Sequence, residues 1–378
     1  MKIALVHDWL INPGGAEKCL EVFHELYPAA PLYTLLYSAK TAETLNFEPE
    51  KVTASHLQKR PGILKNYRKY LALLPFAIEQ FDLSEFDIIL SSSHCVAKGV
   101  LSKGEQLHIC YCHTPVRYAW DLTHEYLREN SLEKGFKSLL ARIVLHYIRL
   151  WDLHSANRVD YFIANSQYTA RKIWRTYRRR AEVIYPPVNL QFFQPRQAKK
   201  DYFIFVSRLV AYKKAELVIK AFNELGLPLV VVGEGPQEKR CHRIAGNNVS
   251  FLGYKAGPEL AELMGNARAL VFAAEEDFGI VPLEAQACGT PVIAYGRGGL
   301  RETVIPADES NWDKATGIFF GEQSIAALTG AVEKFVKWEK NFQVQAMVNN
   351  AQRFSRERFC HEISSFVQEK YRIFKSEL

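Results

Sequence analysis

Two glutamates, Glu276 and Glu284, lie eight positions apart on either side of a tight apolar turn. The apolar run 271–274 predicts a strand before the turn, and the run that ends at Gly289 predicts a helix after it. Carboxylates accept hydrogen bonds from hydroxyl groups, and a helix N-terminus favours an anion. The pattern therefore predicts a site for a ligand with many hydroxyl groups beside phosphates, as in a sugar nucleotide. The alternative is that both glutamates are solvated residues at a helix start.

A pair of basic residues follows another predicted strand. Arg208 and Lys213 come directly after the apolar run 202–206 and lie five positions apart. Cations at such a strand end can neutralise the charge that develops on a departing phosphate, which is usually the largest contribution to this kind of catalysis. Lys214 is adjacent to Lys213, so the sequence leaves open which lysine acts, and a surface loop is the alternative for both.

Further candidates follow strands in the N-terminal half. Gly14 and Gly15 come after the run 3–6 and would let the backbone approach a phosphate closely, although a glycine pair before a helix is often only a turn. The run 107–111 is followed by polar and aromatic residues that suit the recognition of a sugar. These residues are His113, Arg117, Trp120 and Asp121. The alternative for His113 is a helix cap.

Strands and helices alternate along the chain, which is typical of parallel sheets covered by helices. One series of short apolar strands begins at residue 3 and a second at residue 202, with the proline-rich stretch 184–200 between them as a predicted linker. We therefore predict an α/β protein with two Rossmann-like domains that face each other across a cleft. The first would span residues 1–195 and the second residues 196–352, followed by an amphipathic helix in 353–378.

Composition excludes several classes of protein. The chain has 378 residues, of which 48% are hydrophobic, and no uncharged run reaches the ~20 residues that a membrane-spanning helix needs. Its seven cysteines are irregularly spaced, which argues against a disulfide framework. Cys110 and Cys112 are interpreted as small residues of a buried strand, and no metal site is expected. The N-terminus lacks the pattern of a signal peptide, so we expect a cytoplasmic protein.

Two regions carry most of the net charge of +7. The first, 51–78, contains six basic residues, no acid and several interleaved apolar side chains, and it is the favoured candidate for contact with an anionic membrane surface. In the second, the apolar residues between 136 and 151 recur at helical spacing and are interpreted as the core face of an interior helix. Nucleic acid is not expected as a partner, because no binding motif accompanies the charge.

The segments 207–213 and 275–294 resemble the signature of the retaining glycosyltransferases of family 4, and the resemblance extends over nearly the whole chain. It implies the glycosyltransferase B (GT-B) fold, in which the first domain binds the acceptor, the second binds the donor and the terminal helix packs back onto the first domain. The segment 112–121 further resembles the WbaZ-like mannosyltransferase branch, which builds O-antigen and exopolysaccharide chains.

The resemblance also implies roles for individual residues. Glu276 would contact the donor sugar and Glu284 the ribose of the nucleotide, while the turn between them would bind the donor. The turn residues concerned are Phe278, Gly279, Ile280 and Val281. Arg208 and Lys213 would stabilise the leaving diphosphate, and many relatives have glycine at the position of Lys214. His113 would lie near the hydroxymethyl group of the sugar, and Gly14 and Gly15 beside the diphosphate.

The expected function is thus the transfer of a sugar, with mannose from GDP-mannose as the favoured donor, to a glycan acceptor on a lipid carrier. No other cofactor is expected. No Asp-x-Asp motif occurs and no carboxylate is an evident nucleophile, so the resemblance implies a metal-independent reaction with front-side attack. The alternatives are a UDP-sugar donor, a non-catalytic sugar-nucleotide-binding scaffold, a nucleotide-sugar epimerase and, more remotely, an NAD-dependent oxidoreductase.

Overall fold

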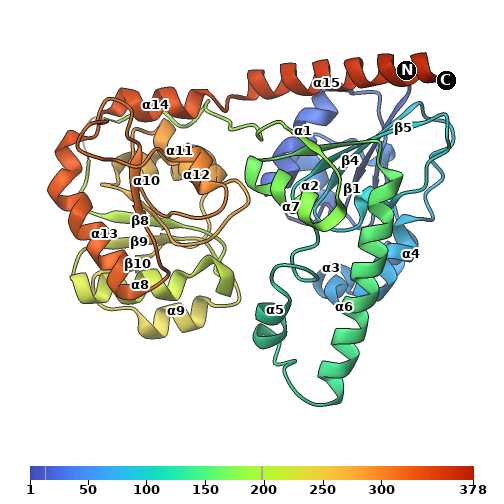
Figure 1. Cartoon of the computed structure of the whole chain (residues 1–378). Helices are drawn as coiled ribbons and strands as arrows, with labels where there is room; N and C mark the ends of the chain where they lie inside the picture. The colour runs from blue at the N-terminus through green and yellow to red at the C-terminus, as the bar shows by residue number, and fades with distance from the viewer. Residues whose placement is uncertain (13, 197–198) are drawn as a thin grey trace. The chain divides into compact units, whose positions relative to one another are not determined.

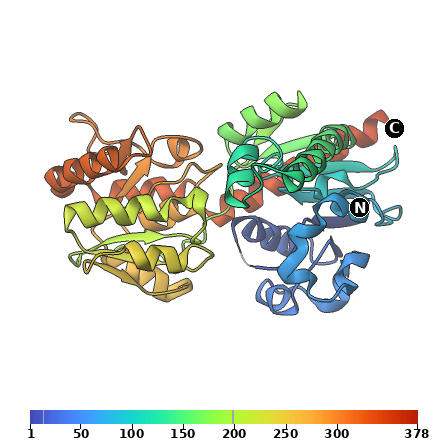
Figure 2. The ribbon, with the colours of Figure 1, turned by 90° about the horizontal axis from the view of Figure 1, so that it is seen from below.

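The computed structural model describes residues 1–12, 14–196 and 199–378. They form two compact units, one of Met1–Pro186 with Phe359–Leu378 and one of Pro187–Arg358. In each unit, helices cover both faces of a parallel sheet (Figures 1 and 2). Gln197 and Ala198 of the predicted linker lie outside the described residues, and the limits of the two functional domains stay a prediction.

The first unit contains a seven-stranded sheet in the order β3-β2-β1-β4-β5-β6-β7. Its strands are β1 (Ile3–His7), β2 (Leu32–Thr34), β3 (Val52–Ala54), β4 (Ile88–Ser93), β5 (Leu107–Cys112), β6 (Tyr161–Ala164) and β7 (Ala181–Val183). Every residue of β1, β4 and β5 is buried, because helices lie on both faces, and this explains their nearly continuous apolar sequences.

The α-helices of the first unit come between its strands, and the last one returns from the end of the chain. They are α1 (Gly15–Leu26), α2 (Ala39–Thr44), α3 (Ile63–Asn66), α4 (Leu74–Ile78), α5 (Thr123–Glu129), α6 (Phe136–Ser155), α7 (Gln167–Tyr177) and most of α15 (Arg356–Glu377). The return of the terminal helix is confirmed, since Phe359 of α15 stacks on Phe23 of α1 and meets the ring of Tyr111 in β5 edge-on.

The second unit contains a six-stranded sheet in the order β10-β9-β8-β11-β12-β13. Its strands are β8 (Phe203–Val206), β9 (Leu229–Val232), β10 (Val249–Phe251), β11 (Leu270–Phe272), β12 (Val292–Tyr295) and β13 (Gly317–Phe320). Its helices are α8 (Ala215–Leu225), α9 (Glu238–Ile244), α10 (Gly257–Asn266), α11 (Ile280–Ala287), α12 (Leu300–Thr303), α13 (Ile325–Trp338) and α14 (Val344–Gln352). The predicted pair of Rossmann-like parallel sheets is confirmed.

One sequence-based interpretation is wrong in part. The apolar stripe 136–151 does form a helix, α6, but only part of it faces the core. Leu145 and Ile148 are buried, whereas Phe136, Leu139 and Ile143 are exposed. In the described part of the chain, no helix is both long and apolar enough to cross a bilayer.

Candidate functional site

The loop after β8 carries the predicted basic pair. Arg208 follows the strand and is exposed, while Lys213 ends a short 3-10 helix, η6 (Ala211–Lys213). A second loop supports this one, because Leu209 N–H donates to the Glu234 carbonyl at 2.9 Å. Gly233, at φ +130°, lies so close to Ser207 that a Cβ would stand 1.9 Å from its carbonyl oxygen. The backbone that presents the two cations is therefore fixed by close packing.

The loop after β11 carries Glu276, whose carboxylate forms an ion pair with the Lys213 ammonium. The backbone at Glu276 is held by a third loop, since Gly299 N–H donates to the Glu276 carbonyl at 2.8 Å. A Cβ on Gly298 would stand 2.3 Å from that same carbonyl oxygen. Only glycine fits there, so this close approach positions the acidic member of the pair.

The turn after Glu276 leads into helix α11. Phe278 is buried and its ring meets that of Phe354, while Gly279 has φ +102° and lets the chain turn into the helix. Ile280 and Val281 form the first turn and are half-buried. Glu284 is 3% exposed and is the fifth helical residue, so it lies buried in the second turn of α11 and is not a solvated residue at the helix start.

These elements bring a cation pair, a carboxylate and a helix N-terminus to the carboxyl ends of neighbouring strands. Strands β8 and β11 are adjacent and parallel, so the loops that follow them lie at the same edge of the sheet. Ligands of open α/β sheets bind at this edge. The N-terminal N–H groups of α11 and the cations favour phosphate, and the carboxylates favour hydroxyl groups.

The first unit gathers histidines at the corresponding edge of its sheet. His7 ends β1, His94 follows β4 and His113 follows β5. Ser92 Oγ links two of them, at 3.1 Å from His7 Nδ1 and 2.8 Å from His113 Nε2. His7 Nε2 in turn lies 3.5 Å from the buried carboxylate of Glu17. This network connects His113 to groups that can hold or orient a proton.

Asp8 anchors the loop beside these histidines. Its buried carboxylate accepts four backbone N–H groups at 2.5–2.9 Å, from residues 94 to 97. Burial by itself raises the pKa of Asp8, but the charges of His94 and His7 and these hydrogen bonds outweigh it and hold the pKa below its usual value. Burial lowers the pKa of His94, although the adjacent Asp8 carboxylate opposes this shift.

We predict that Asp8→Asn lowers the free energy of unfolding by about 3 kcal/mol at neutral pH, because an amide NH₂ would then face two of the four N–H donors. The folded-state pKa of Asp8 is lowered, so its contribution is present above the unfolded value of 3.8 and is lost as the pH falls through the folded value. Urea unfolding at several pH values should show the difference between the two proteins shrinking under acid.

The matched control is Glu85→Gln, which removes an exposed carboxylate from the same unit. It should change the free energy of unfolding by no more than about 0.5 kcal/mol. An Asp8→Asn protein as stable as this control would contradict the anchoring role.

The remaining candidates of the first unit have defined surroundings. The indole N–H of Trp120 donates to Asp152 at 2.7 Å, and the exposed Asp121 pairs with Lys172 at 2.6 Å. Arg117 is half-buried in the turn between β5 and α5. Gly14 and Gly15 are exposed at the start of α1, and a Cβ on Gly14 would stand 2.9 Å from Glu17 Oε2.

Asn165 and Ser166, which directly follow β6, have structural roles. Ser166 caps helix α7, accepting from Thr169 N–H at 2.9 Å. The side chain of Asn165 donates to the His113 carbonyl at 2.9 Å. Ser166 thus starts helix α7, and Asn165 positions the backbone of His113.

The sequence reasoning missed His7, His94, Ser92 and Glu17. A usable signal was present, because three of these residues end a predicted strand or lie just after it, where parallel strands place polar residues at one edge. It also missed Gly298 and Gly299, whose close contacts with the Glu276 loop depend on a pairing between distant segments.

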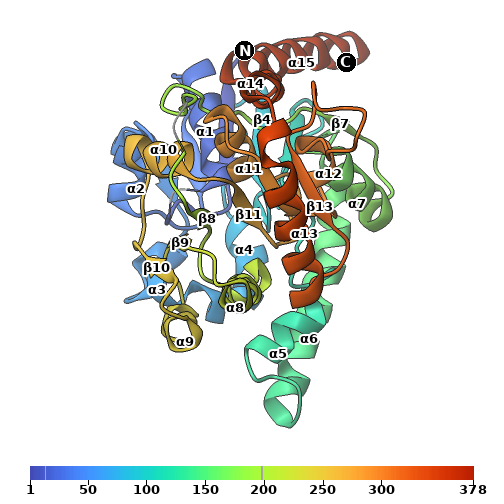
Figure 3. The same cartoon turned by 90° about the vertical axis from the view of Figure 1, so that its left-hand side faces the viewer.

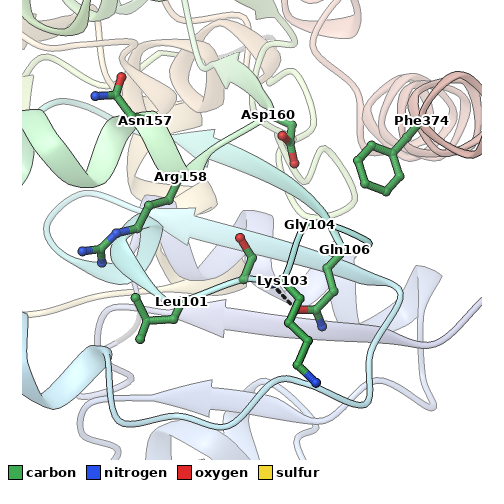
Figure 4. Close-up of a pocket in the computed structure, with 9 residues that line it drawn as sticks. Leu101, Lys103, Gly104, Gln106, Asn157, Arg158, Asp160 and Phe374 are labelled. Carbon is green, nitrogen blue, oxygen red and sulfur yellow. Dashed lines mark hydrogen bonds between the residues drawn. The ribbon is translucent and has the colours of Figure 1, made fainter. Parts of the chain in front are cut away.

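A separate hollow of about 400 Å³ lies at the opposite edge of the first sheet (Figure 4). Lys103, Gln106, Arg158 and Asp160 line it, together with Phe374 of α15. The Lys103 N–H donates to Gln106 Oε1 at 2.8 Å, and Gln106 also donates to the carbonyls of Leu83 and Phe86. These polar groups are therefore engaged in holding the loop before β5.

Comparison with protein families assigns both halves of the chain. Residues 13–192 match the family described as Glycosyltransferase Family 4, and residues 189–354 match the one described as Glycosyl transferases group 1. Among solved structures, HepE of Anabaena in complex with UDP and glucose superimposes with a TM-score of 0.69 at 20% identity, covering 97% of this chain and 99% of that one.

Curated relatives align at low identity or over short segments. An alpha-1,3/1,6-mannosyltransferase of Mus musculus is 24% identical over 75% of this chain and 73% of its own length. A GDP-mannose-dependent mannosyltransferase of Corynebacterium glutamicum, which acts on a monoacylated phosphatidylinositol monomannoside, is 38% identical over 27% of this chain and 31% of its own. With three other curated glycosyltransferases, the alignments span only 38–44% of the relatives' lengths. The chain thus carries a glycosyltransferase family 4 domain followed by a group 1 domain, on a GT-B fold.

Proposed function

We propose that this chain transfers mannose from GDP-mannose to a glycan acceptor, with retention of the anomeric configuration and without a metal ion. The mannosyl assignment is supported by the two curated relatives named as mannosyltransferases, one of which is named as dependent on GDP-mannose. The observation that carries the transferase proposal is the Lys213–Glu276 ion pair, held beside Arg208 and the N-terminus of α11.

This arrangement fits the electrostatic demands of the reaction. The acceptor oxygen bonds to the anomeric carbon while the bond from that carbon to the diphosphate oxygen breaks, and the diphosphate leaves with the electron pair. An ammonium has three N–H donors, so Lys213 can contact Glu276 and a phosphate oxygen together. Arg208 and the α11 N-terminus would add positive potential as charge develops on the diphosphate.

The proposed retention relies on front-side attack, in which the departing phosphate accepts the proton of the acceptor hydroxyl. A covalent mechanism would need a carboxylate nucleophile, and the carboxylates of Asp8, Asp121 and Glu276 each have other partners. Asp8 accepts four backbone N–H groups, Asp121 pairs with Lys172, and Glu276 pairs with Lys213. Trapping a covalent glycosyl adduct on any of the three would refute this mechanism.

The remaining roles are proposed from the family resemblance. Glu284 would bind the ribose, and the backbone from Phe278 to Val281 would bind the donor. In the first unit, His113 would contact the sugar, while Arg117, Trp120 and Asp121 would contribute to a sugar or acceptor pocket. A lipid-linked acceptor at a membrane is supported by the lipid acceptor in the name of the relative from Corynebacterium glutamicum.

A UDP-sugar donor is the second candidate, because the similar structure of HepE is a complex with UDP and glucose. Stabilisation by ligands distinguishes the donors, since a ligand that binds only the folded protein raises Tm by mass action. We expect GDP-mannose and GDP to raise Tm by about 5 °C at ~100 times their Kd, whereas UDP-glucose, UDP-N-acetylglucosamine, UDP and NAD should leave it unchanged.

Each outcome of this panel has a defined meaning. A shift with UDP and a UDP-sugar alone would keep the transferase proposal and remove mannose. A shift with NAD alone would support an oxidoreductase, and no shift with any nucleotide would contradict the transferase proposal. Release of an epimerised nucleotide sugar in the absence of acceptor would support an epimerase instead.

A further inference from the structure

Helix α6 exposes an apolar ridge along its outer face. In the described part of the chain, eighteen large hydrophobic side chains are exposed, and seven of them lie on this one helix. They are Phe136, Leu139, Leu140, Ile143, Tyr147, Leu150 and Leu153. At 100° per residue, the first six fall within an arc of about 100°, and they extend for about 21 Å along the helix. Contiguous exposed patches of this kind mark interaction sites.

The ridge is not a core face left open by a loosely packed helix. Leu145, Ile148 and Asp152, which point to the opposite side, are buried against the unit. Lys98, Trp120 and Tyr177 all bond to Asp152 and fix the orientation of the helix. In Figures 1 and 3, the N-terminal half of α6 extends with α5 away from the sheet of its unit.

The exposed or half-buried charges of α6 itself have one sign, whereas Glu129 and Glu133, in the segment before the helix, are exposed acids. Lys137, Arg142 and Arg149 are the charged residues of α6 apart from Asp152, its single acid, which is buried. The 3-10 helix η3 (Tyr67–Leu73), which packs against α6, adds the exposed Arg68 and Lys69. A cationic border around an apolar stripe suits a partner whose outer layer is anionic and whose interior, just below that layer, is apolar.

We propose that the outer face of α6 docks on an anionic phospholipid bilayer, with the apolar ridge entering the headgroup boundary and the basic residues contacting lipid phosphates. Amphipathic helices bind bilayers in this way, lying in the interface rather than crossing it. The basic flank strengthens binding to anionic lipid specifically.

A second copy of this chain fits the ridge less well. A symmetric dimer apposes the same surface on both partners, so the basic flank of one copy would face the basic flank of the other. Like charges so placed repel each other, and α6 offers no exposed carboxylate to compensate. Charge complementarity therefore selects the lipid surface.

The proposal assigns the membrane contact of the proposed function to helix α6. Its biological purpose rests on that function, but the predicted binding to lipid does not depend on sugar transfer. It differs from the sequence-based expectation, which favoured the basic region 51–78. In that region Leu64, Tyr67, Tyr70 and Leu71 pack against the core, although Leu73 and Phe76 remain exposed.

The test is co-sedimentation of the full chain with vesicles of phosphatidylcholine alone and of phosphatidylcholine mixed with phosphatidylglycerol. We expect binding to the mixed vesicles, and a loss of at least ~tenfold in the apparent partition coefficient for Leu139→Gln/Ile143→Gln/Leu150→Gln. The matched control, Phe192→Gln/Leu252→Gln/Tyr254→Gln, removes three exposed apolar side chains from the second unit and should bind like the original protein.

Three results would overturn the proposal. The first is no binding of the original chain to anionic vesicles, and the second is equal binding by the α6 variant. The third is a loss of binding on replacing the basic residues of the 51–78 region by glutamine while the α6 variant still binds; these residues are Lys59, Arg60, Lys65, Arg68 and Lys69. Sedimentation velocity adds the dimer outcome, in which the α6 variant becomes monomeric and lipid binds neither protein. Because no sugar transfer is measured, failure here leaves the nucleotide thermal-shift result intact.

Discussion

Replacing Lys213 by alanine is expected to slow sugar transfer by ~10²-fold or more, of order 3 kcal/mol of transition-state stabilisation, as for other single groups that stabilise developing charge. The reason is the place of its ammonium, which Glu276 holds at the carboxyl edge of the second sheet. Arg208→Ala should have an effect of the same size, since its guanidinium follows the same strand. The measurement is kcat and kcat/KM with the donor identified by thermal shift.

Lys214→Gly is the matched control, because it removes a neighbouring positive charge from the same loop. Lys214 has φ +61°, a conformation that glycine adopts without strain. The control should keep transfer within about threefold of the original rate, since the Lys213–Glu276 ion pair remains in place. A large loss of transfer rate in Lys214→Gly, with none in Lys213→Ala, would show that Lys214 rather than Lys213 stabilises the leaving group.

The variant Glu276→Ala tests whether the chain is an enzyme or a non-catalytic binding scaffold. If the chain is an enzyme, removing this carboxylate should lower kcat, because it both holds Lys213 and is expected to contact the sugar. An unchanged rate of transfer with retained nucleotide binding would favour the non-catalytic alternative.

A change in transfer rate below threefold in both Arg208→Ala and Lys213→Ala would show that another loop carries the chemistry.

Whether a feature of the site could be predicted depends on how far apart in the sequence the interacting residues lie. Arg208, Lys213 and Glu276 follow strands whose apolar runs are visible in the sequence, and parallel strands place such residues at one edge. The specific pairing of Lys213 with Glu276 joins positions 63 residues apart, and no local pattern encodes it. The same holds for the contact of Gly298 with the Glu276 carbonyl.

Short strands, and helices with apolar residues on two faces, limit what the sequence pattern can predict. Strands β2, β3 and β7 have three residues each, too few to show a periodicity. In α6, apolar residues recur on both faces, so spacing alone does not indicate which face is inside. Asp152 determines which face of α6 is buried, because a buried carboxylate must face its hydrogen-bond donors.

We expect Asp152→Asn to lower the free energy of unfolding by about 3–5 kcal/mol, the second large effect predicted for this chain. Asp152 is fully buried and accepts from Lys98, from the Trp120 indole at 2.7 Å and from the Tyr177 hydroxyl at 2.8 Å. Removing its charge leaves the Lys98 ammonium buried beside the Cys95 carbonyl at 3.2 Å. Urea unfolding with a fluorescence readout would measure the loss.

The pKa of Lys98 gives the pH dependence of this interaction. Burial by itself lowers that pKa, but the Asp152 charge outweighs burial and holds it above the usual value of 10.5. A raised folded-state pKa means that the stabilisation is fully present below 10.5 and is lost as the pH rises through the folded value. The difference between the original protein and Asp152→Asn should therefore stay constant around neutral pH and narrow in strong alkali.

Two comparisons test whether burial is the reason for the large loss of stability expected for Asp152→Asn. Asp121→Asn breaks a lysine–aspartate pair in which Asp121 is exposed, and it should cost at most about 1 kcal/mol. The double variant Lys98→Met/Asp152→Leu removes both buried charges and should be less destabilised than the sum of its single changes, since no isolated charge remains. Equal losses for Asp152→Asn and Asp121→Asn would show that the buried pair does not hold α6 in place, and the orientation of its apolar ridge would then need another cause.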